Sequence, residues 1–493
     1  MHASFRGVVA SRRPCAVGRS AAYHDSRQYV GARATATLLG RPGAQVKQRR
    51  GAPHSRPGRR EGSDLLRAAA AGDKSSAAAQ PSAGAKVLLV GGTGAVGSAA
   101  AIHMLQAASY PLQVVLAGRD SERGARCVRQ VAQECGGLAA LSGSGHSVEF
   151  QQLDWRDGTA LEHAIAGATA VVHTAGPYAR QEPGILAACI AARVPCYVDL
   201  SDPLEYIDAA LGLSGQAAAQ GRGTMALLAS GAFPGFSNLL AVECASRLEE
   251  PVADLSFRYF TAGLGGSGPV NLLITNQGFG EPVSRLRAGR MEPAMVSGLE
   301  AERVKFYIDE TDESAERVGE RTVWSWPFPE VATVAKALAI SNDSSVKMGT
   351  SPDAWNVIMG WMVQLVPREW WRNLAFSQWM ADFSEPMVKF TDKFVGETHC
   401  MRVDVTGESG AVCTAVQGHD SFRRVVGQSC AEFALHLLDR HTAARDAPAG
   451  WRPGVYLPEQ LLAAEHRDER RALLERLARL PGTFTYRIAA RGS

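Results

Sequence analysis

A glycine-rich stretch, VLLVGGTGAVG at residues 87–97, constrains the fold of this chain more than any other segment. Four apolar residues suited to a buried strand run directly into Gly92-Thr93-Gly94-Ala95-Val96-Gly97, which fits the pattern Gly-x-Gly-x-x-Gly. The chain has 50 glycines, so the pattern alone is weak evidence. It gains weight between a strand and a helix, because the first turn of a βαβ unit presents free N–H groups to a pyrophosphate.

The sequence around the stretch supplies that context. From Lys86 to about residue 245, apolar strand-like runs alternate with Ala-rich helical segments, a pattern typical of a parallel sheet covered on both faces. We therefore predict an α/β fold with a Rossmann-like doubly wound parallel sheet; the alternative for the loop is a glycine turn that binds no dinucleotide. The expected strands are 86–91, 112–117, 147–153, 169–174, 194–200 and 223–229, and the expected helices are 95–108, 120–135, 158–166 and 182–193.

The pattern changes after Pro251. Runs of alternating apolar and polar residues predict an antiparallel sheet with one exposed face, and so a second, α+β domain. The last part of the chain begins with a turn near Arg452 and continues as an amphipathic helix. The alternating runs are DLSFRYFT, ERVKFYID, CMRVDVTG and AVCTAVQG.

Charge is unevenly distributed along the chain, which the formal net charge of +3 conceals. The first 60 residues carry 13 Lys and Arg against one acid, whereas the rest carry 39 against 48. An acidic body argues against nucleic-acid binding. Residues 1–75 lack hydrophobic periodicity and an apolar signal core, which is typical of an organelle transit peptide. A basic arm with another use is the alternative.

The end of the second expected strand, Ala117-Gly118-Arg119-Asp120, selects the nucleotide. Arg119 favours NADP because a guanidinium pairs with the 2′-phosphate, whereas Asp120 keeps NAD open. Arg119 as a solvated loop charge is the alternative. Asp154, after the third strand, is a candidate contact to the adenine or the N-cap of the helix near 158.

The fourth expected strand ends at Ala175-Gly176-Pro177, where the nicotinamide half of a dinucleotide would pass. Tyr178 and Asp199 flank that crevice and are the candidate catalytic proton carriers; Ser201 and Asp202 lie beside them. Helix capping is the alternative for both aspartates.

Other reaction classes find no support in the sequence. No tyrosine is followed by a lysine four residues later, which excludes the catalytic form of short-chain dehydrogenases, and no Gly-x-Ser-x-Gly elbow follows a strand. The nine cysteines show no Cys-x-x-Cys pair, so we expect no metal site.

Several motifs occur together in one order: GGTGAVG, AGR, AGPY with a later YVDLSD, GAFPGFSN, GLGGSGP and GVYLPEQ. On these motifs residues 86–486 resemble the saccharopine dehydrogenase-like oxidoreductase family, which has an NADP-binding domain, in its plant chloroplast and cyanobacterial type. The resemblance implies that 92–97 bind the phosphates, Arg119 the 2′-phosphate, and 175–177 the nicotinamide side. It implies a location in the chloroplast, with the mitochondrion as the alternative.

The resemblance also implies a domain plan with a dimerising second domain and a C-terminal return onto the first. We predict a leader at 1–75, a linker at 76–85, the Rossmann domain at 86–248, a substrate or homodimer domain at 249–450 and a returning segment at 451–493.

The implied activity is NADP-dependent hydride transfer to or from a C=N or C=O bond of a small-molecule metabolite. The alternative is an NADP(H)-binding sensor or scaffold without catalysis. The family's name-giving substrates carry several carboxylates, which need arginines. The candidates are Arg258, Arg285, Arg287 and Arg402, of which we expect Arg258 and Arg402 to point outward.

A Trp-rich segment, residues 355–379, has no role in this scheme. Its apolar stretch, Ala354 to Pro367, is too short to span a bilayer. Three interpretations stay open: core packing or a dimer contact, a lid over the substrate, and a helix on a membrane surface.

Overall fold

In the computed structural model, the described residues are 84–219, 223–263, 269–296, 298–444 and 451–491. They all belong to the second of two units, Met1–Ala77 and Ala78–Ser493. The predicted leader, nearly all of the predicted linker and the centre of GLGGSGP lie outside the described residues.

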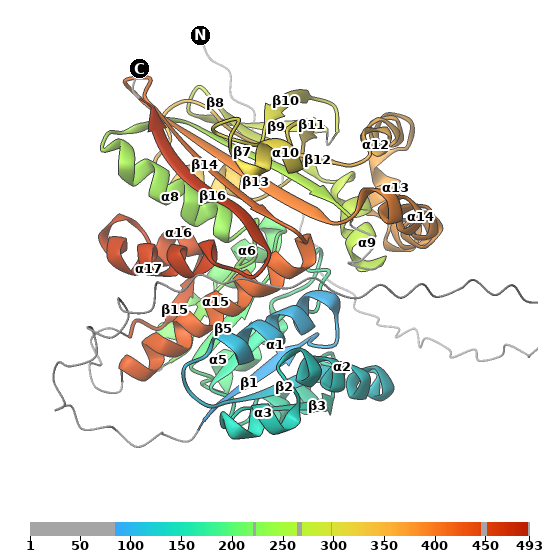
Figure 1. Ribbon diagram of the computed structural model, residues 1–493, viewed down its shortest axis with the longest axis vertical. Coiled ribbons are helices and arrows are strands. Elements are labelled where there is room, and N and C mark those ends of the chain that lie inside the picture. Colours follow the sequence, from blue (N-terminus) through green and yellow to red (C-terminus); the bar gives the residue numbers. More distant parts are fainter. Residues whose placement is uncertain (1–83, 220–222, 264–268, 297, 445–450, 492–493) are drawn as a thin grey trace, which may run out of the picture. The chain divides into compact units, whose positions relative to one another are not determined.

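Seven parallel strands form the first sheet, in the order β15-β6-β5-β4-β1-β2-β3 (Figure 1). From β1 the chain continues outward to β2 and β3, and from β4 it continues in the opposite direction to β5 and β6. The neighbours β1 and β4 therefore mark the switch point, where doubly wound sheets bind ligands. The six strands expected from the sequence are all present: β1 Ala85–Val90, β2 Leu112–Gly118, β3 Ser147–Gln152, β4 Ala170–His173, β5 Cys196–Asp199 and β6 Met225–Leu227.

Helices cover both faces of this sheet. Val87 and Leu89 pack in one core with α1, α2 and α15, whereas Leu88 and Val90 pack in a second core with α4, α5 and α6. The α/β, doubly wound fold class is therefore confirmed. The helices are α1 Ala95–Ala107, α2 Ser121–Glu134, α3 Leu138–Gly143, α4 Gly158–Ile165, α5 Gly184–Ala191, α6 Leu204–Leu211, α7 Ser214–Ala218 and α15 Phe422–Ala443.

Nine strands form the second sheet, in which β10-β11-β12-β7-β13-β14-β16 are adjacent and β8 joins β12 to β9. The expected antiparallel pairing holds except between β7 and β12, which are parallel. The strands are β7 Val252–Ala262, β8 Pro282–Arg287, β9 Arg290–Val296, β10 Ala301–Lys305, β11 Glu320–Ser325, β12 Ser344–Thr350, β13 Thr398–Gly407, β14 Val412–His419 and β16 Thr483–Arg491.

The expectation of one exposed face is wrong for the central strand β7. Helix α8 (Phe236–Leu248) covers the side of Phe257 and Tyr259, and Phe306 packs on the other side against Phe260. The remaining helices of this part are α9 Pro269–Gly278, α10 Glu313–Arg317, α11 Glu330–Ala337, α12 Asp353–Leu365, α13 Arg368–Arg372 and α14 Leu374–Val395. None of the described helices is long and apolar enough to cross a bilayer.

The end of the chain contributes a strand to each sheet. β15 (Gly454–Tyr456) pairs with β6 of the first sheet, and β16 pairs with β14 of the second. Between them lie α16 (Pro458–Leu461), the short 3-10 helix η3 (Ala464–His466) and α17 (Arg467–Ala478). Helix α15, from the predicted second domain, lies beside α1 on the first sheet (Figure 1), while the predicted domain boundaries themselves stay predictions.

Two of the sequence motifs meet in the interior. The side-chain amide of Asn238, in GAFPGFSN, donates to Glu459, in GVYLPEQ, at 2.8 Å. Next to them, Ser237 and Tyr259 both donate to the buried Glu330, the latter at 2.7 Å. Burial raises the pKa of Glu330 to about 7. This polar cluster joins α8, α11, α16 and β7.

Candidate dinucleotide and substrate site

The glycine loop leaves β1 at Val90 and enters α1 at Ala95. The tight turn falls on Gly91, with φ at +83°, and not on Gly92 as the pattern suggested. A Cβ on Gly91 would lie 2.7 Å from the backbone nitrogen of Ala175, so glycine lets the loop contact the end of β4. A Cβ on Gly97 would lie 2.5 Å from the Gly91 carbonyl oxygen, so the start of α1 needs a glycine there too.

Backbone donors at the start of α1 suit an anionic ligand. The N–H of Gly94 donates to Gly91 within the turn, and the first helical hydrogen bond runs from Ser98 to Gly94. The N–H groups of Ala95, Val96 and Gly97 therefore have no intrahelical acceptor. Such a set, at the positive end of a helix, binds phosphate.

Two arginines follow β2: Arg119 lies directly after the strand, and Arg123 lies in the first turn of α2. Arg119 is exposed, and the next residue, Asp120, caps α2 by accepting the Arg123 N–H at 3.0 Å. The Arg123 guanidinium donates to the Thr93 carbonyl at 3.1 Å, which holds it against the glycine loop. Arg123 was missed from the sequence; the signal was its place in the first turn of a helix capped by Asp120.

A cavity of about 990 Å³ adjoins the loop, with Thr93, Gly94 and Ala95 in its wall. The described arginines in its wall are 123, 126, 423 and 424, and the wall also contains His103 and Glu134. Four guanidinium groups and one carboxylate make a cationic wall that fits a phosphorylated ligand.

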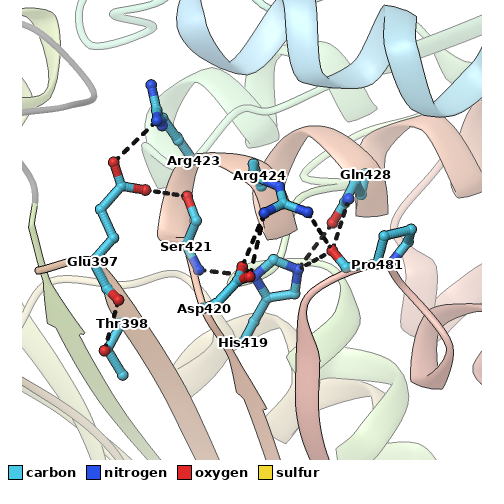
Figure 2. A network of polar contacts seen from close by, with 9 residues as sticks. All are labelled: Glu397, Thr398, His419, Asp420, Ser421, Arg423, Arg424, Gln428 and Pro481. Atoms are coloured by element: carbon cyan, nitrogen blue, oxygen red, sulfur yellow. Dashed lines mark hydrogen bonds and ion pairs between the residues drawn. The ribbon is translucent and has the colours of Figure 1, made fainter. Parts of the chain in front are cut away.

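Arg423 and Arg424 come from the start of α15 and are held by a polar network (Figure 2). Arg424 pairs with Asp420 at 3.3 Å and donates to the Pro481 carbonyl at 2.8 Å. Arg423 points away from that group, toward Glu397, at 3.1 Å (Figure 2). The network ties β14, α15 and the loop before β16 together beside the glycine loop.

Asp154 follows β3 and is exposed. Its carboxylate accepts the Arg156 N–H at 3.2 Å, and a contact to adenine stays a prediction. The alternative interpretation as a helix cap is wrong, because Asp157 caps α4 through the Ala160 N–H.

The two predicted proton carriers are both engaged in the interior. The buried Tyr178 hydroxyl donates to the His173 carbonyl at 2.6 Å and accepts the Leu200 N–H at 3.2 Å. Burial raises its pKa well above the usual value. These bonds fix the loop that carries Ala175, Gly176 and Pro177.

Asp199 is buried at the end of β5. One carboxylate oxygen accepts the Ser201 hydroxyl at 2.7 Å and the Ala229 N–H at 3.0 Å, and the other accepts the Tyr197 hydroxyl. Neither Asp199 nor Asp202 caps α6, whose N-cap is Pro203, so the capping interpretation is wrong. Proton transfer by Tyr178 or Asp199 stays a prediction, and their contacts are those of positioning residues.

Asp202 is half-buried in the wall of a second cavity, of about 310 Å³, past the ends of β4 and β5. Burial, with a smaller contribution from Asp199, raises the pKa of Asp202 to about 6. A carboxyl group with that pKa can take or give a proton near neutrality. From the sequence, Asp202 was expected beside the crevice, with Tyr178 and Asp199 as the candidate proton carriers.

The same cavity is acidic. Among its described residues, Asp202, Glu205, Asp208 and Glu281 are acids and Arg180 is basic. Arg180 pairs with Glu281 at 3.5 Å. The rest of the wall is largely apolar, with Ile274, Trp326, Phe328 and several prolines.

The candidate carboxylate-binding arginines lie elsewhere, in the second sheet. Arg258 pairs with Glu302 at 2.9 Å and Arg285 with Glu292 at 3.0 Å. Arg402 pairs with Asp404 at 2.8 Å, and Arg287 is exposed. The expectation that Arg258 points outward is wrong, since it is 7% exposed; its strand is covered on that face.

Comparisons with known proteins agree with this geometry. Residues 87–183, which run from within β1 to beyond β4, match the model of the NAD dependent epimerase/dehydratase family. No curated protein sequence shows significant similarity to the chain. The family match supports a nicotinamide cofactor and leaves NAD or NADP open.

Among solved structures, apo saccharopine dehydrogenase (L-Glu forming) from Saccharomyces cerevisiae is similar, with a TM-score of 0.51 at 14% identity. The match covers 83% of this chain and 100% of the yeast chain. A meso-dapdh mutant with DAP from Clostridium tetani matches at 11% identity with a lower TM-score of 0.35. That match covers 78% of this chain and 98% of the other chain. The saccharopine dehydrogenase-like fold expected from the motifs is confirmed.

Proposed function

We propose that this chain, with its saccharopine dehydrogenase-like fold, is an NADP-dependent oxidoreductase acting on a C=N or C=O bond of a small molecule. The observation that carries the proposal is the glycine loop at the switch point of the first sheet, with Arg119 just after β2 and Arg123 in the first turn of α2. Loop donors and guanidinium groups together match a dinucleotide with an additional phosphate.

The residues assigned to the cofactor are 92–97 for the phosphates, Arg119 and Arg123 for the 2′-phosphate, and 175–177 for the nicotinamide side. Asp154 is kept as a contact to the adenine. When bound, NADP supplies the hydride chemistry. The chain orients both reactants at the strand ends and excludes water.

We assign proton transfer to Asp202, because it lines the cavity with a raised pKa. Tyr178 and Asp199 position the loops around it. Because burial raises the pKa of Asp202 to about 6, both its protonated and its ionised form occur near pH 6. The protonated form can donate a proton, and the ionised form can accept one.

The acidic cavity favours an uncharged or cationic substrate. A substrate with two or three carboxylates would meet Asp202, Glu205 and Asp208, while the one arginine, Arg180, is paired with the fourth acid, Glu281. Like charges in a partly desolvated cavity repel. Saccharopine and related polycarboxylates are therefore not the proposed substrates.

An NADP(H)-binding sensor without catalysis is the second candidate. It is favoured by one observation: the hydroxyl of Tyr178 and the carboxylate of Asp199 are fully engaged within the protein. Binding of NADPH without its oxidation by any imine, keto or enoyl compound in a panel would support the sensor.

The cofactor assignment is tested by the variants Arg119→Asp and Arg123→Ala. Each removes a guanidinium from the 2′-phosphate, so NADPH should bind about tenfold or more weakly while NADH changes little. Fluorescence titration with both nucleotides measures this, and Arg129→Ala, also on α2, is the control. An equal loss for NADPH and NADH would show that the arginines do not select NADP.

Location and assembly are further parts of the proposal. The acid-poor composition of residues 1–75 supports a chloroplast transit peptide, with the mitochondrion as the alternative. A homodimer through the second domain is supported by the family resemblance alone.

A further inference from the structure

Helix α14 exposes an aromatic stripe along one side. Its members are spaced four, four, three and four residues apart, which places them on one face of a helix. Their exposed fractions run from 41% for Met387 to 76% for Phe394. The stripe consists of Trp379, Phe383, Met387, Phe390 and Phe394.

Helices α12 and α13, next to this stripe, expose further apolar side chains. The indole of Trp355 on α12 donates to Thr391 on α14 at 3.1 Å, so the two helices are in contact. Figure 1 shows α12, α13 and α14 together at one edge of the second sheet, next to α9. We call the exposed residues the apolar helix face: the stripe of α14 with Val357, Ile358, Trp361, Leu365, Trp370 and Leu374.

The inner sides of the same helices are well packed. Trp371 and Val363 form a core with Phe279, and Ala381 packs with Leu272 and Leu273 of α9. The interpretation as core packing therefore holds for Trp371, while Trp361 and Trp370 are 61% and 58% exposed. Exposed apolar surface on firmly packed helices marks an interaction site.

The charges around the face show which kind of surface it fits. The helices carry Arg368, Arg372, Lys389 and Lys393 against Asp353, Glu369, Asp382, Glu385 and Asp392. Lys389 is paired with Glu385 at 2.8 Å. With both signs nearly balanced, the face has no preference for an anionic partner, and the stripe itself is uncharged.

We propose that the apolar helix face docks on the surface of a lipid bilayer with uncharged headgroups. The indole N–H groups of Trp361, Trp370 and Trp379 donate to no described residue. Ester and headgroup oxygens supply acceptors at every position of a lipid surface, and Trp and Phe are favoured at that level. The same face of a second copy would instead present Phe rings and the Met387 thioether, which offer these indoles no oxygen acceptor.

The test is flotation of the full chain with phosphatidylcholine vesicles. We expect binding that Phe383→Glu/Phe390→Glu reduces about tenfold or more, because two carboxylates replace inserted rings. Leu138→Glu is the matched control, since Leu138 is equally exposed on α3, and it should change binding less than about twofold. Circular dichroism checks that each variant folds.

Several outcomes would overturn the proposal. The first is wild-type protein that does not float, and the second is equal loss in the Leu138→Glu control. Binding that requires phosphatidylserine would assign the attachment to the basic leader. A dimer that the double variant dissociates, without vesicle binding, would identify a second copy as the occupant. If the double variant does not fold, quenching of wild-type tryptophans by brominated phosphatidylcholine decides, and unquenched emission contradicts docking.

Discussion

Asp199 and Asp202 are close in sequence and lie in different surroundings. Asp199 is 0% exposed and accepts hydrogen bonds from Ser201, Ala229 and Tyr197. Asp202 lies on the cavity wall. Burial raises the pKa of both, but only for Asp202 is the raised pKa, about 6, combined with access to a ligand. The contacts of each residue, and not its position after the strand, separate a positioning role from a catalytic one.

The raised pKa of Asp202 predicts how kcat/KM depends on pH. Its carboxyl is protonated below pH 6 and can then donate a proton, so reduction should slow as pH rises through about 6, while oxidation should speed up. Asp202→Asn should remove this inflection and lower kcat/KM about 100-fold or more. The measurement is kcat/KM against pH in both directions, with Asp208→Asn, on the same cavity wall, as the control. A wild-type profile that is flat across pH 5–7 would contradict the assignment.

Helix α15, which follows two strands of the second sheet in the chain, is the element that supports the glycine loop. A Cβ on Gly427 would lie 2.5 Å from the Val96 carbonyl oxygen and 2.9 Å from the Ala100 nitrogen. Glycine thus lets α15 lie directly against the first turns of α1. The same helix brings Arg423 and Arg424 to the loop, so its packing bears on the phosphate site.

Gly427→Ala should separate α15 from α1. Although alanine favours a helix, the forced contact with backbone should lower the free energy of unfolding by about 1–3 kcal/mol and weaken NADPH binding. Gly215→Ala is the control, because Gly215 lies in α7 with no atom near its missing Cβ. Urea unfolding and NADPH titration measure both effects; unchanged stability in Gly427→Ala would show that the helices can adjust.

At the scale of the whole described unit, the chain crosses between the two sheets several times. β15 and β16 belong to different sheets, α15 covers the first sheet after two strands of the second, and Asn238 bonds Glu459 between them. Trp326 lines the acidic cavity and also a second, apolar cavity of about 90 Å³, whose wall includes residues of α12 and α14. A chain docked through the apolar helix face would hold its substrate cavity near lipid.

These crossings predict one cooperative unfolding transition, because neither sheet keeps all its covering elements when the other unfolds. Calorimetry of the full chain should give equal calorimetric and van't Hoff enthalpies, with far-UV and near-UV circular dichroism changing together. Saturating NADPH should raise the midpoint of this single transition. Two resolved transitions, with NADPH shifting one of them, would show that the sheets unfold independently.

Local patterns in the sequence determined the first sheet. The order of strands and helices, the glycine loop and its place after β1 follow from apolar runs, turn residues and N–H groups, all of which are set by neighbours along the chain. For the same reason the alternating runs predicted β7, β10, β13 and β14 of the second sheet, but not its other five strands. They did not predict that β7 is covered on both faces, since that depends on segments far away in the sequence.

The tertiary structure decided which charged and polar groups of the candidate site are paired inside the protein and which line a cavity. Arg123 on the loop, the engaged Tyr178 and Asp199, the available Asp202 and the paired Arg258 all depend on contacts between distant segments, which alternation and spacing do not record. The sequence by itself determined a Rossmann-like fold and the glycine loop after its first strand. Only packing decided which charged groups were paired in the interior and which lined a cavity, because burial and hydrogen bonding are properties of surroundings and not of residue type.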